Sequence, residues 1–247
     1  MNETSKKARL WLRSYLAGEK CAACGETETK GLGVLCQSCS EKLNALAGVT
    51  CPRCRRPVRE CGCVKENMRS SGTVGVAKLG FYVSSETDSP LYRVIWRLKS
   101  NRDRLLAEEL ASRLKPCVGT AAAGRGADLS AAFVTYVPRS GKKVKREGVD
   151  QAKLLAEALA ESMGLCCLKL IKRRKEGVSA QKKLAVGERA ENVSGMFAPS
   201  GEFIPRGANV ILVDDLITTG ATVSECSRIL KMSGAGMIIC ACLAEPF

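Results

Sequence analysis

Two adjacent carboxylates follow four branched apolar residues in the segment VILVDDLITTGAT, residues 210–222. Like charges repel and a buried carboxylate is costly, so we expect Asp214 and Asp215 to lie beside a ligand or at an open edge of a sheet. A Thr-Thr-Gly-Ala-Thr turn comes next and leads into a predicted helix, whose first N–H groups and dipole favour a phosphate. A carboxylate pair beside a phosphate site fits a ligand that also carries hydroxyl groups, as a ribose 5-phosphate does.

The predicted phosphate site is one unbroken turn in which backbone N–H groups are the donors. Gly220 allows close approach of the ligand, and threonine hydroxyls add further hydrogen bonds. The turn consists of Leu216, Ile217, Thr218, Thr219, Gly220, Ala221 and Thr222. The alternative interpretation is an ordinary strand followed by a capped helix. The chain has no GxxxxGK[ST] segment, which argues against an ordinary NTPase P-loop.

A basic segment follows another predicted strand, AAFVTYVP over 131–138. Arginine forks and lysine ammonium groups both suit phosphate, so this segment is a candidate pyrophosphate site. Its candidate residues are Arg139, Ser140, Lys142 and Lys143. A second basic run covers 169–183, and for each run the alternative is a solvated charged surface.

Eight of the 14 cysteines lie between residues 21 and 63, in the pairs CAAC, CQSC, CPRC and CGC. Paired thiolates at this spacing suit a tetrahedral Zn2+, and a module this small needs the metal to fold. We expect two structural zinc sites, although an interleaved pairing of the same cysteines stays open. The first would take Cys21, Cys24, Cys36 and Cys39, and the second Cys51, Cys54, Cys61 and Cys63.

Length and composition set outer limits on the function. The chain has 247 residues and a formal charge of +14, which predicts phosphate-bearing partners, either nucleotides or nucleic acids. It contains no histidine, which excludes histidine bases and every Ser–His or Cys–His nucleophile pair. No apolar run is long enough to cross a bilayer and no signal peptide is visible, so we expect a cytoplasmic protein without membrane insertion.

The elements that must position these residues alternate between strand and helix after Cys63. Strands are expected over 75–84, 131–138, 210–215 and 237–245, and helices over 89–116, 150–164 and 220–233. The first helix should break near 99–103 and stop at Pro116, with a small-residue loop over 118–128. This order predicts an α/β fold with a parallel sheet flanked by helices, and ligands bind at the carboxyl edge of such sheets.

Two structural units are expected. Residues 1–66 would form an N-terminal helix and a double zinc-binding module, and residues 67–247 the α/β domain. The polar segment 64–73 has no periodicity and is expected to be the linker between them.

These segments together resemble the ComF family, whose members join an N-terminal zinc module to a type I phosphoribosyltransferase domain. VILVDDLITTGAT resembles that domain's phosphoribosyl pyrophosphate (PRPP) motif, and LKSNRD over 98–103 resembles the family's lysine-containing segment. A further pattern of the family is matched by Gln181, Leu184, Arg189, Asn192, Val193, Gly195 and Phe197. The chain departs from the family in having Glu147 where an arginine is usual, and Val178 where a threonine is common.

The resemblance implies a type I phosphoribosyltransferase-like fold that binds PRPP or ribose 5-phosphate together with Mg2+. It implies that Asp214 and Asp215 hold the ribose hydroxyls, that 216–222 binds the 5-phosphate, and that 169–183 is a mobile loop. It also implies a link to DNA uptake during natural transformation, with single-stranded DNA and DNA-uptake proteins as partners. Two functions stay open: transfer of the phosphoribosyl group, or a non-catalytic single-stranded DNA-binding factor that keeps a PRPP-like site.

Overall fold

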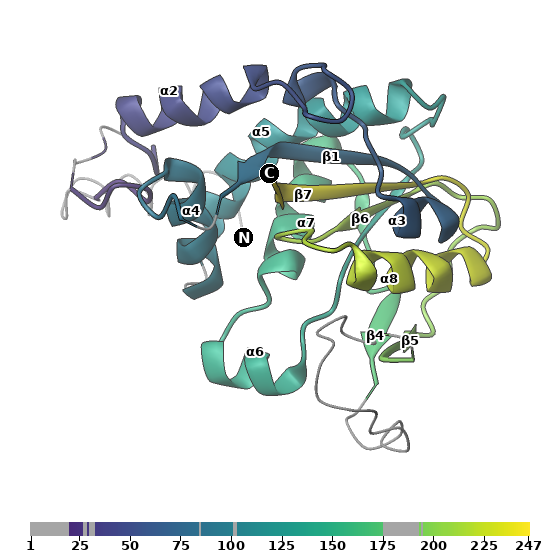
Figure 1. Cartoon of the computed structure of the whole chain (residues 1–247). Helices are drawn as coiled ribbons and strands as arrows, with labels where there is room; N and C mark the ends of the chain where they lie inside the picture. The colour runs from purple at the N-terminus through teal and green to yellow at the C-terminus, as the bar shows by residue number, and fades with distance from the viewer. Residues whose placement is uncertain are drawn as a thin grey trace, which may run out of the picture.

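The computed structural model describes residues 20–26, 29, 33–83, 85–100, 103–174, 193 and 195–247, with only the backbone for Lys143 and Glu147. A five-stranded sheet lies at its centre, with the order β1-β7-β6-β2-β3 and parallel pairing throughout (Figure 1). Its strands are β1 (Thr73–Tyr82), β7 (Ile238–Pro246), β6 (Val210–Val213), β2 (Phe133–Tyr136) and β3 (Cys166–Cys167). This confirms the predicted α/β class.

Helices cover both faces of the sheet because the strand residues alternate between two apolar cores. Ile211 and Val213 of β6 join the core under α4 (Pro90–Ser100), α5 (Arg104–Ala123) and α7 (Gln151–Met163). Val210 and Leu212 join the opposite core, under α8 (Ala221–Met232) and α3 (Glu66–Ser70). The other elements are α2 (Gln37–Ala45), η1 (Leu46–Gly48), η2 (Val58–Glu60), α6 (Gly141–Glu147), β4 (Ile171–Arg173) and β5 (Phe197–Pro199).

The sheet has a topological switch point between β2 and β6, which are neighbours. From β2 the chain passes through α7 to β3 on one side, and from β6 it passes through α8 to β7 on the other. The two connections diverge and leave a crevice at the carboxyl ends of these strands, where ligands bind in open α/β sheets. The residues after β6 are Asp214 and Asp215, and those after β2 lead to Arg139.

The predicted helix stop at Pro116 is wrong, because α5 runs on to Ala123 and takes in the start of the predicted loop over 118–128. A proline inside a helix removes one backbone hydrogen bond and strains the preceding turn. That cost is offset here by burial, since Val118, Ala121 and Ala122 all pack in the core beyond the proline. The Thr120 hydroxyl also donates to the Pro116 carbonyl at 3.1 Å.

The expected linker over 64–73 instead contains α3, which packs against α8. Met68 at its centre is 0% exposed, and burial of this one side chain secures a helix too short to show periodicity in the sequence. Whether residues 1–66 fold apart from 67–247 stays a prediction.

Several expectations concern residues outside the described ranges. They are the N-terminal helix before residue 20, the basic run beyond Arg174, and the family pattern from Gln181 to Asn192 with Val178. In the part of the chain that is described, no helix is both long and apolar enough to cross a membrane.

Candidate functional site

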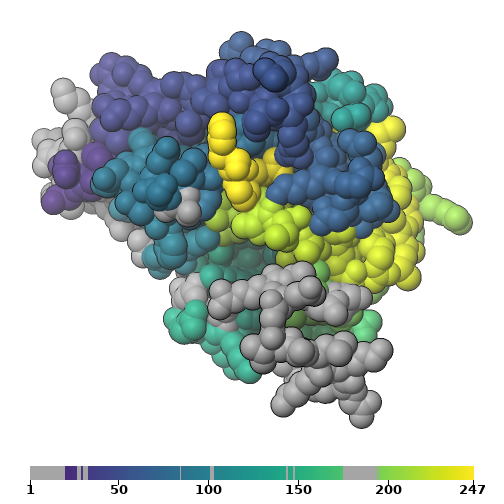
Figure 2. All heavy atoms as spheres, in the orientation of Figure 1, coloured from purple at the N-terminus to yellow at the C-terminus, as the bar shows by residue number. Residues whose placement is uncertain are grey.

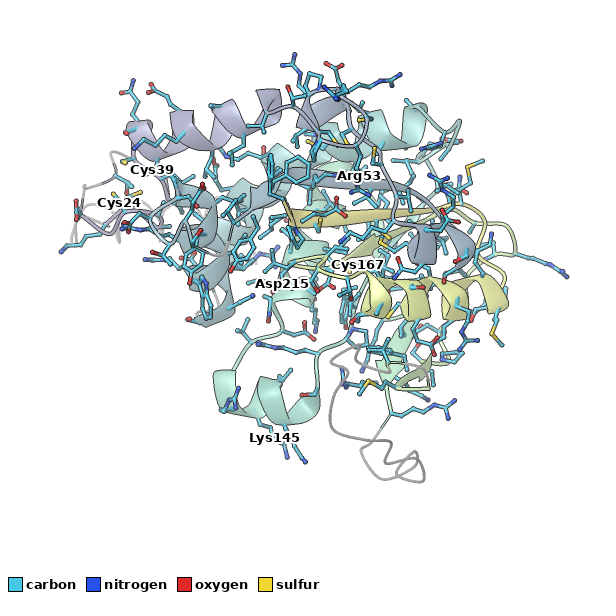
Figure 3. All side chains as sticks on the ribbon, viewed as in Figure 1. Cys24, Cys39, Arg53, Lys145, Cys167 and Asp215 are labelled. Atoms are coloured by element: carbon cyan, nitrogen blue, oxygen red, sulfur yellow. The ribbon has the colours of Figure 1, made fainter. Side chains whose placement is uncertain are left out.

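An open cleft of about 800 Å3 lies at the switch point of the sheet. It brings together groups from α4, from the ends of β2 and β6, and from the start of α7. The lining includes Trp96, Lys99, Arg139, Ser140, Arg146, Asp150, Gln151, Arg173, Asp214, Asp215 and Thr222. Asp215 lies where the sheet edge opens toward α6, on which Lys145 points away from the carboxylate (Figure 3).

Asp215 is held by two side chains from different helices. Gln151 Nε2 donates to Asp215 Oδ2 at 3.0 Å, and Lys99 Nζ lies 3.5 Å from the same oxygen. The other oxygen, Oδ1, accepts the Leu216 N–H at 2.8 Å. These contacts fix the carboxylate at the mouth of the cleft, with an ammonium group beside it.

Asp214 is the more unusual member of the pair. Burial and the adjacent charge of Asp215 raise the pKa of its carboxyl well above the ordinary value, although Lys99 opposes that shift. Its Oδ1 accepts the Asp215 N–H at 2.9 Å. The carboxyl therefore holds a proton more readily than a free aspartate, and a cationic ligand or a positively charged ribose would favour its ionised form.

The predicted phosphate turn divides into an anchored part and an open part. The N–H of Leu216 bonds Asp215, and that of Ile217 bonds the Ala244 carbonyl at 3.1 Å, so these two amides are engaged within the protein. In the ranges that the structure describes, the N–H groups of Thr218, Thr219 and Gly220 have no protein acceptor. The open donors are therefore fewer than the sequence predicts, and they start at Thr218.

Gly220 has the left-handed backbone that its residue type allows, with φ of +83°. It is the N-cap residue of α8, and Thr218 and Thr219 before it are exposed. The helix N-terminus adds its dipole to the open donors, so an anion at Thr218–Thr222 would be favoured. Thr222 lines the cleft, whereas the Thr219 hydroxyl accepts the Ala221 N–H at 3.3 Å.

The carbonyl side of the same turn faces the segment 64–71. Asn67 Nδ2 donates to the Thr219 carbonyl at 3.1 Å, and Lys65 Nζ donates to the Thr218 carbonyl. A Cβ at Gly220 would come within 2.8 Å of Met68 Sδ. The phosphate turn is thus packed against α3 over three successive residues, and Figure 2 shows the blue segment around α3 in contact with the lime residues that begin α8.

The predicted pyrophosphate residues are only partly brought to the cleft. Arg139 and Ser140 line it, and the Arg139 guanidinium bonds Gln151 Oε1 at 2.7 Å and the Val149 carbonyl at 3.3 Å. Lys142 lies on α6, away from the lining, and the Lys143 side chain lies outside the described atoms. Arg146, also on α6, lines the cleft.

Each set of four cysteines forms a compact cluster, and the interleaved pairing is not the one observed. Within each set all sulfur atoms lie within 4.8 Å of one another. Four thiolates around a metal at about 2.3 Å would be separated by somewhat less than that distance, so both sets fit a tetrahedral metal site. The first cluster is Cys21, Cys24, Cys36 and Cys39, and the second is Cys51, Cys54, Cys61 and Cys63.

Backbone N–H groups favour the ionised form of one thiol in each cluster, Cys21 in the first and Cys51 in the second, whereas burial raises the pKa of Cys39 and Cys63 to about 12. Burial alone would raise the pKa of Cys51, but the N–H groups of Cys54 and Arg53 outweigh it and lower that pKa to about 7. In the first cluster the Cys36 and Ala23 N–H groups donate to Cys21 Sγ at 3.2 and 3.4 Å. Donors aimed at sulfur are the chemistry that a thiolate metal site requires.

A buried ion pair connects the second cluster to the sheet. Lys78 on β1 and Glu245 on β7 are both 0% exposed, and Lys78 Nζ lies 2.9 Å from Glu245 Oε2. Arg53, between Cys51 and Cys54, reaches the same oxygen at 2.7 Å (Figure 3). The second cluster is therefore attached to the strand beside the phosphate turn.

Sequence reasoning missed Trp96, Gln151 and Arg146 as cleft residues. Lys99 had a signal, since it lies in the lysine-containing segment LKSNRD. Gln151 is the residue after the helix N-cap Asp150, a position that suggests only helix geometry. Trp96 lies on α4 and meets the cleft only through the packing of that helix.

Comparison with known proteins agrees with this geometry. A model of the phosphoribosyl transferase domain family matches residues 144–246. DNA utilization protein YhgH of Salmonella typhimurium is 29% identical over 161 residues, covering 65% of this chain and 70% of that protein. Competence protein F of Haemophilus influenzae is 30% identical over 159 residues, covering 63% and 66%. Competence protein ComFC of Streptococcus pneumoniae is 32% identical over 99 residues, covering 40% and 41%.

Proposed function

Because the chain belongs to the ComF family and carries a phosphoribosyltransferase domain, we propose that it binds PRPP or a ribose 5-phosphate ligand in the cleft at the switch point. One observation carries the proposal. The Asp214–Asp215 pair comes directly after β6, and an open anion site at a helix N-terminus follows within a few residues. A ligand with vicinal hydroxyls and a phosphate matches both features.

Each group in the cleft has a part in this proposal. Asp214 and Asp215 accept hydrogen bonds from the ribose hydroxyls, while Lys99 and Gln151 keep the Asp215 carboxylate in place. The N–H groups from Thr218 onward bind the 5-phosphate and fix the ribose without taking part in bond breaking. The pyrophosphate lies toward the end of β2, where arginine forks can bind it. We assign that end to Arg139, Ser140, Arg146 and Arg173, with Lys142 and Lys143 nearby on α6.

Transfer of the phosphoribosyl group places positive charge on the ribose ring as pyrophosphate leaves C1. The carboxylates of Asp214 and Asp215 would stabilise that charge. The raised pKa of Asp214 supports this assignment, because a carboxylate whose charge is disfavoured without ligand is stabilised when positive charge develops nearby.

Magnesium is expected with PRPP from the family resemblance. Lys99 Nζ lies 3.5 Å from Asp215 Oδ2 and occupies the position that a cation bound to this oxygen would take. Gln151 donates to the same oxygen. These contacts do not fit a metal ion bound directly by Asp215, so we derive no step through magnesium.

We further propose that both cysteine clusters bind structural zinc. All four positions around each metal would be taken by protein sulfur, which leaves none for a substrate. Zinc would supply the folding energy that a short Cys-rich segment cannot obtain from burial.

A second function, binding of single-stranded DNA, is favoured by a row of aromatic rings that ends at the cleft. The Tyr82 and Tyr92 rings stack with centroids 5.8 Å apart, and Trp96 follows at 5.8 Å. Trp96 is 48% exposed, and Lys99 Nζ lies 5.4 Å from its ring centroid. Exposed rings beside cations bind unpaired bases without sequence preference, and relatives are named for competence and DNA utilization.

Calorimetry tests the first proposal. Ribose 5-phosphate and PRPP should bind the wild-type chain, and Asp215→Asn should weaken both because the hydroxyls lose a charged acceptor. Thr219→Val should also weaken both if its hydroxyl contributes to the 5-phosphate site. Glu202→Gln is the matched control, since Glu202 is exposed and lies outside the cleft lining. Equal binding by Asp215→Asn and Glu202→Gln would refute the ribose assignment.

Salt dependence tests the second. Binding of a single-stranded oligonucleotide should weaken steeply as salt rises, and Trp96→Ala should weaken it about five- to a hundredfold at any salt. Phe203→Ala, which removes an aromatic ring that is 82% exposed elsewhere, is the control. If the two variants bind the oligonucleotide with equal affinity, the aromatic row is not part of the DNA site.

A further inference from the structure

The segment that leaves the second cysteine cluster makes three consecutive contacts with the phosphate turn. Lys65 donates to the Thr218 carbonyl, Asn67 donates to the Thr219 carbonyl at 3.1 Å, and Met68 is buried beneath Gly220. These are the residues of the turn whose N–H groups are open for a ligand.

Because the peptide group is planar, these contacts at the carbonyl groups also fix the direction of the neighbouring N–H donors. In a trans peptide the C=O and the following N–H point in opposite directions. A Thr218 carbonyl that faces Lys65 therefore directs the Thr219 N–H away from α3. A Thr219 carbonyl that faces Asn67 does the same for the Gly220 N–H. Both donors are thereby aimed at the open side of the turn.

The direction of the Asn67 amide is itself fixed. Its Oδ1 accepts the Met68 N–H at 3.0 Å, so Nδ2 is left to face the Thr219 carbonyl. The Asn67 carbonyl accepts the Ser224 hydroxyl at 2.7 Å, which ties α3 to the first turn of α8. Asn67 thus connects the turn and the helix that follows it.

The second cluster also holds the turn at its other end. Arg53 binds Glu245 at 2.7 Å, and the neighbouring residue, Ala244, accepts the Ile217 N–H at 3.1 Å. Lys65 lies two residues beyond Cys63, and Val64 between them is buried. The start and the end of the turn are therefore both attached to residues that the same four cysteines hold in place.

We propose that Lys65 and Asn67 are positioning residues of the phosphate turn, and that a metal at the second cluster sets the affinity of the turn for a 5-phosphate. This inference rests on the proposed function for its ligand. Coupling between two sites is reciprocal, so a ligand at the turn must also retain the metal. The hydrogen bonds of Lys65 and Asn67 thus join the Cys-rich module to the ligand site.

The first cluster provides an internal control. Its contacts run to α4 and α5: Arg93 donates to the Cys24 carbonyl at 3.2 Å, and Arg113 donates to the Ser40 hydroxyl at 2.8 Å. None of the contacts found among the described residues joins this cluster to residues 216–222. The rate at which it releases metal should therefore not change when a ligand binds at the turn.

Amide hydrogen exchange by NMR tests the positioning without any ligand. The Ile217 and Ser224 N–H groups flank the open donors and bond Ala244 and Gly220. Asn67→Ala should speed their exchange about fivefold, the equivalent of one lost hydrogen bond. Arg69→Ala alters an exposed residue of the same helix and should leave both rates unchanged. Equal rates in the two variants would overturn the proposal.

Zinc release tests the coupling to the metal. With a chromogenic chelator, saturating ribose 5-phosphate should slow release from the second cluster about fivefold or more and leave the first cluster unaffected. Cys39→Ser and Cys63→Ser assign the two phases, and Asn67→Ala, which keeps every cysteine, should abolish the slowing. Slowing that persists in Asn67→Ala, or that is equal for both clusters, would refute the coupling.

The two proposals fail separately. A wild-type chain that shows no calorimetric binding of ribose 5-phosphate refutes the proposed ligand and the coupling to it, while the exchange rates still decide the positioning. A chain that binds the ligand, with unchanged exchange and unchanged zinc release, refutes this inference alone.

Discussion

A methyl group added at Gly220 is the most direct probe of the contact between α3 and the phosphate turn. The backbone there has φ of +83°, which costs an alanine about 1–2 kcal/mol. The new Cβ would also lie 2.8 Å from Met68 Sδ and 2.9 Å from its Cγ. Met68 is 0% exposed and overpacking of this kind costs about 1–3 kcal/mol, so Gly220→Ala should lose about 2–5 kcal/mol in all.

Gly234 separates the two contributions because it lies just past the other end of α8. Its φ is +92°, but a Cβ there would meet nothing closer than Arg206 Cγ at 3.6 Å, an ordinary contact. Gly234→Ala should therefore lose only the backbone part, about 1–2 kcal/mol. It should also leave ribose 5-phosphate binding unchanged, whereas Gly220→Ala should weaken it.

Urea unfolding of the zinc-loaded chain measures these differences, and a double-mutant cycle isolates the contact. Met68→Ala alone should cost about 2–5 kcal/mol through the cavity it leaves. In the double variant the methyl group added at Gly220 has room, so the combined loss should fall short of the sum by about 1–3 kcal/mol. If Gly220→Ala costs no more than Gly234→Ala, and the two losses add to within about 0.5 kcal/mol, the packing argument is wrong.

Three further predictions concern charge and metal. Asp214→Asn should abolish ligand binding yet raise the melting temperature. Because the pKa of Asp214 is raised in the folded chain from the ordinary 3.8, ionisation destabilises the fold as pH rises, so the variant's advantage in melting temperature should grow as pH rises above about 4; a constant difference would count against it. Glu245→Gln should cost about 3–5 kcal/mol by leaving the Lys78 ammonium buried without its carboxylate, and adding Lys78→Met should recover most of that loss in urea unfolding. Metal analysis should find two zinc ions per chain, and Cys21→Ser should lose one of them; eight reactive thiols and no metal would refute the zinc assignment.

Elements with strong local signals could be predicted from the sequence. The run from Val210 to Val213 is continuous and branched, as a strand buried on both faces must be. Two residues indicate the ends of helix α7. Asp150 is its N-cap and accepts the Lys153 N–H at 3.3 Å, and Gly164 lies in the left-handed region past its last residue. Asp214 and Asp215 could be placed at the sheet edge because they follow directly on a strand.

Features decided by contacts distant in the sequence could not be predicted. In isolation, Pro116 is a reliable signal that a helix stops. Burial of the residues beyond it outweighs that signal here. Helix α3 depends on the burial of Met68 against residues of the phosphate turn, and nothing in the polar segment 64–73 indicates it. Likewise, Lys99 and Gln151 meet at Asp215 only once α4, α7 and β6 are assembled.

The position of β7 has a consequence for how the chain is made. It lies between β1 and β6, so the strand of the sheet that leaves the ribosome last fills an interior place. Until residues 238–246 are synthesised, the backbone of β1 lacks its parallel neighbour and Lys78 lacks its counter-ion. Closing so long a loop is slow, and an unpaired strand edge can associate with other chains while it waits. The cysteine segments can fill with metal early in translation, but the second cluster cannot dock beside the phosphate turn until β7 has been made.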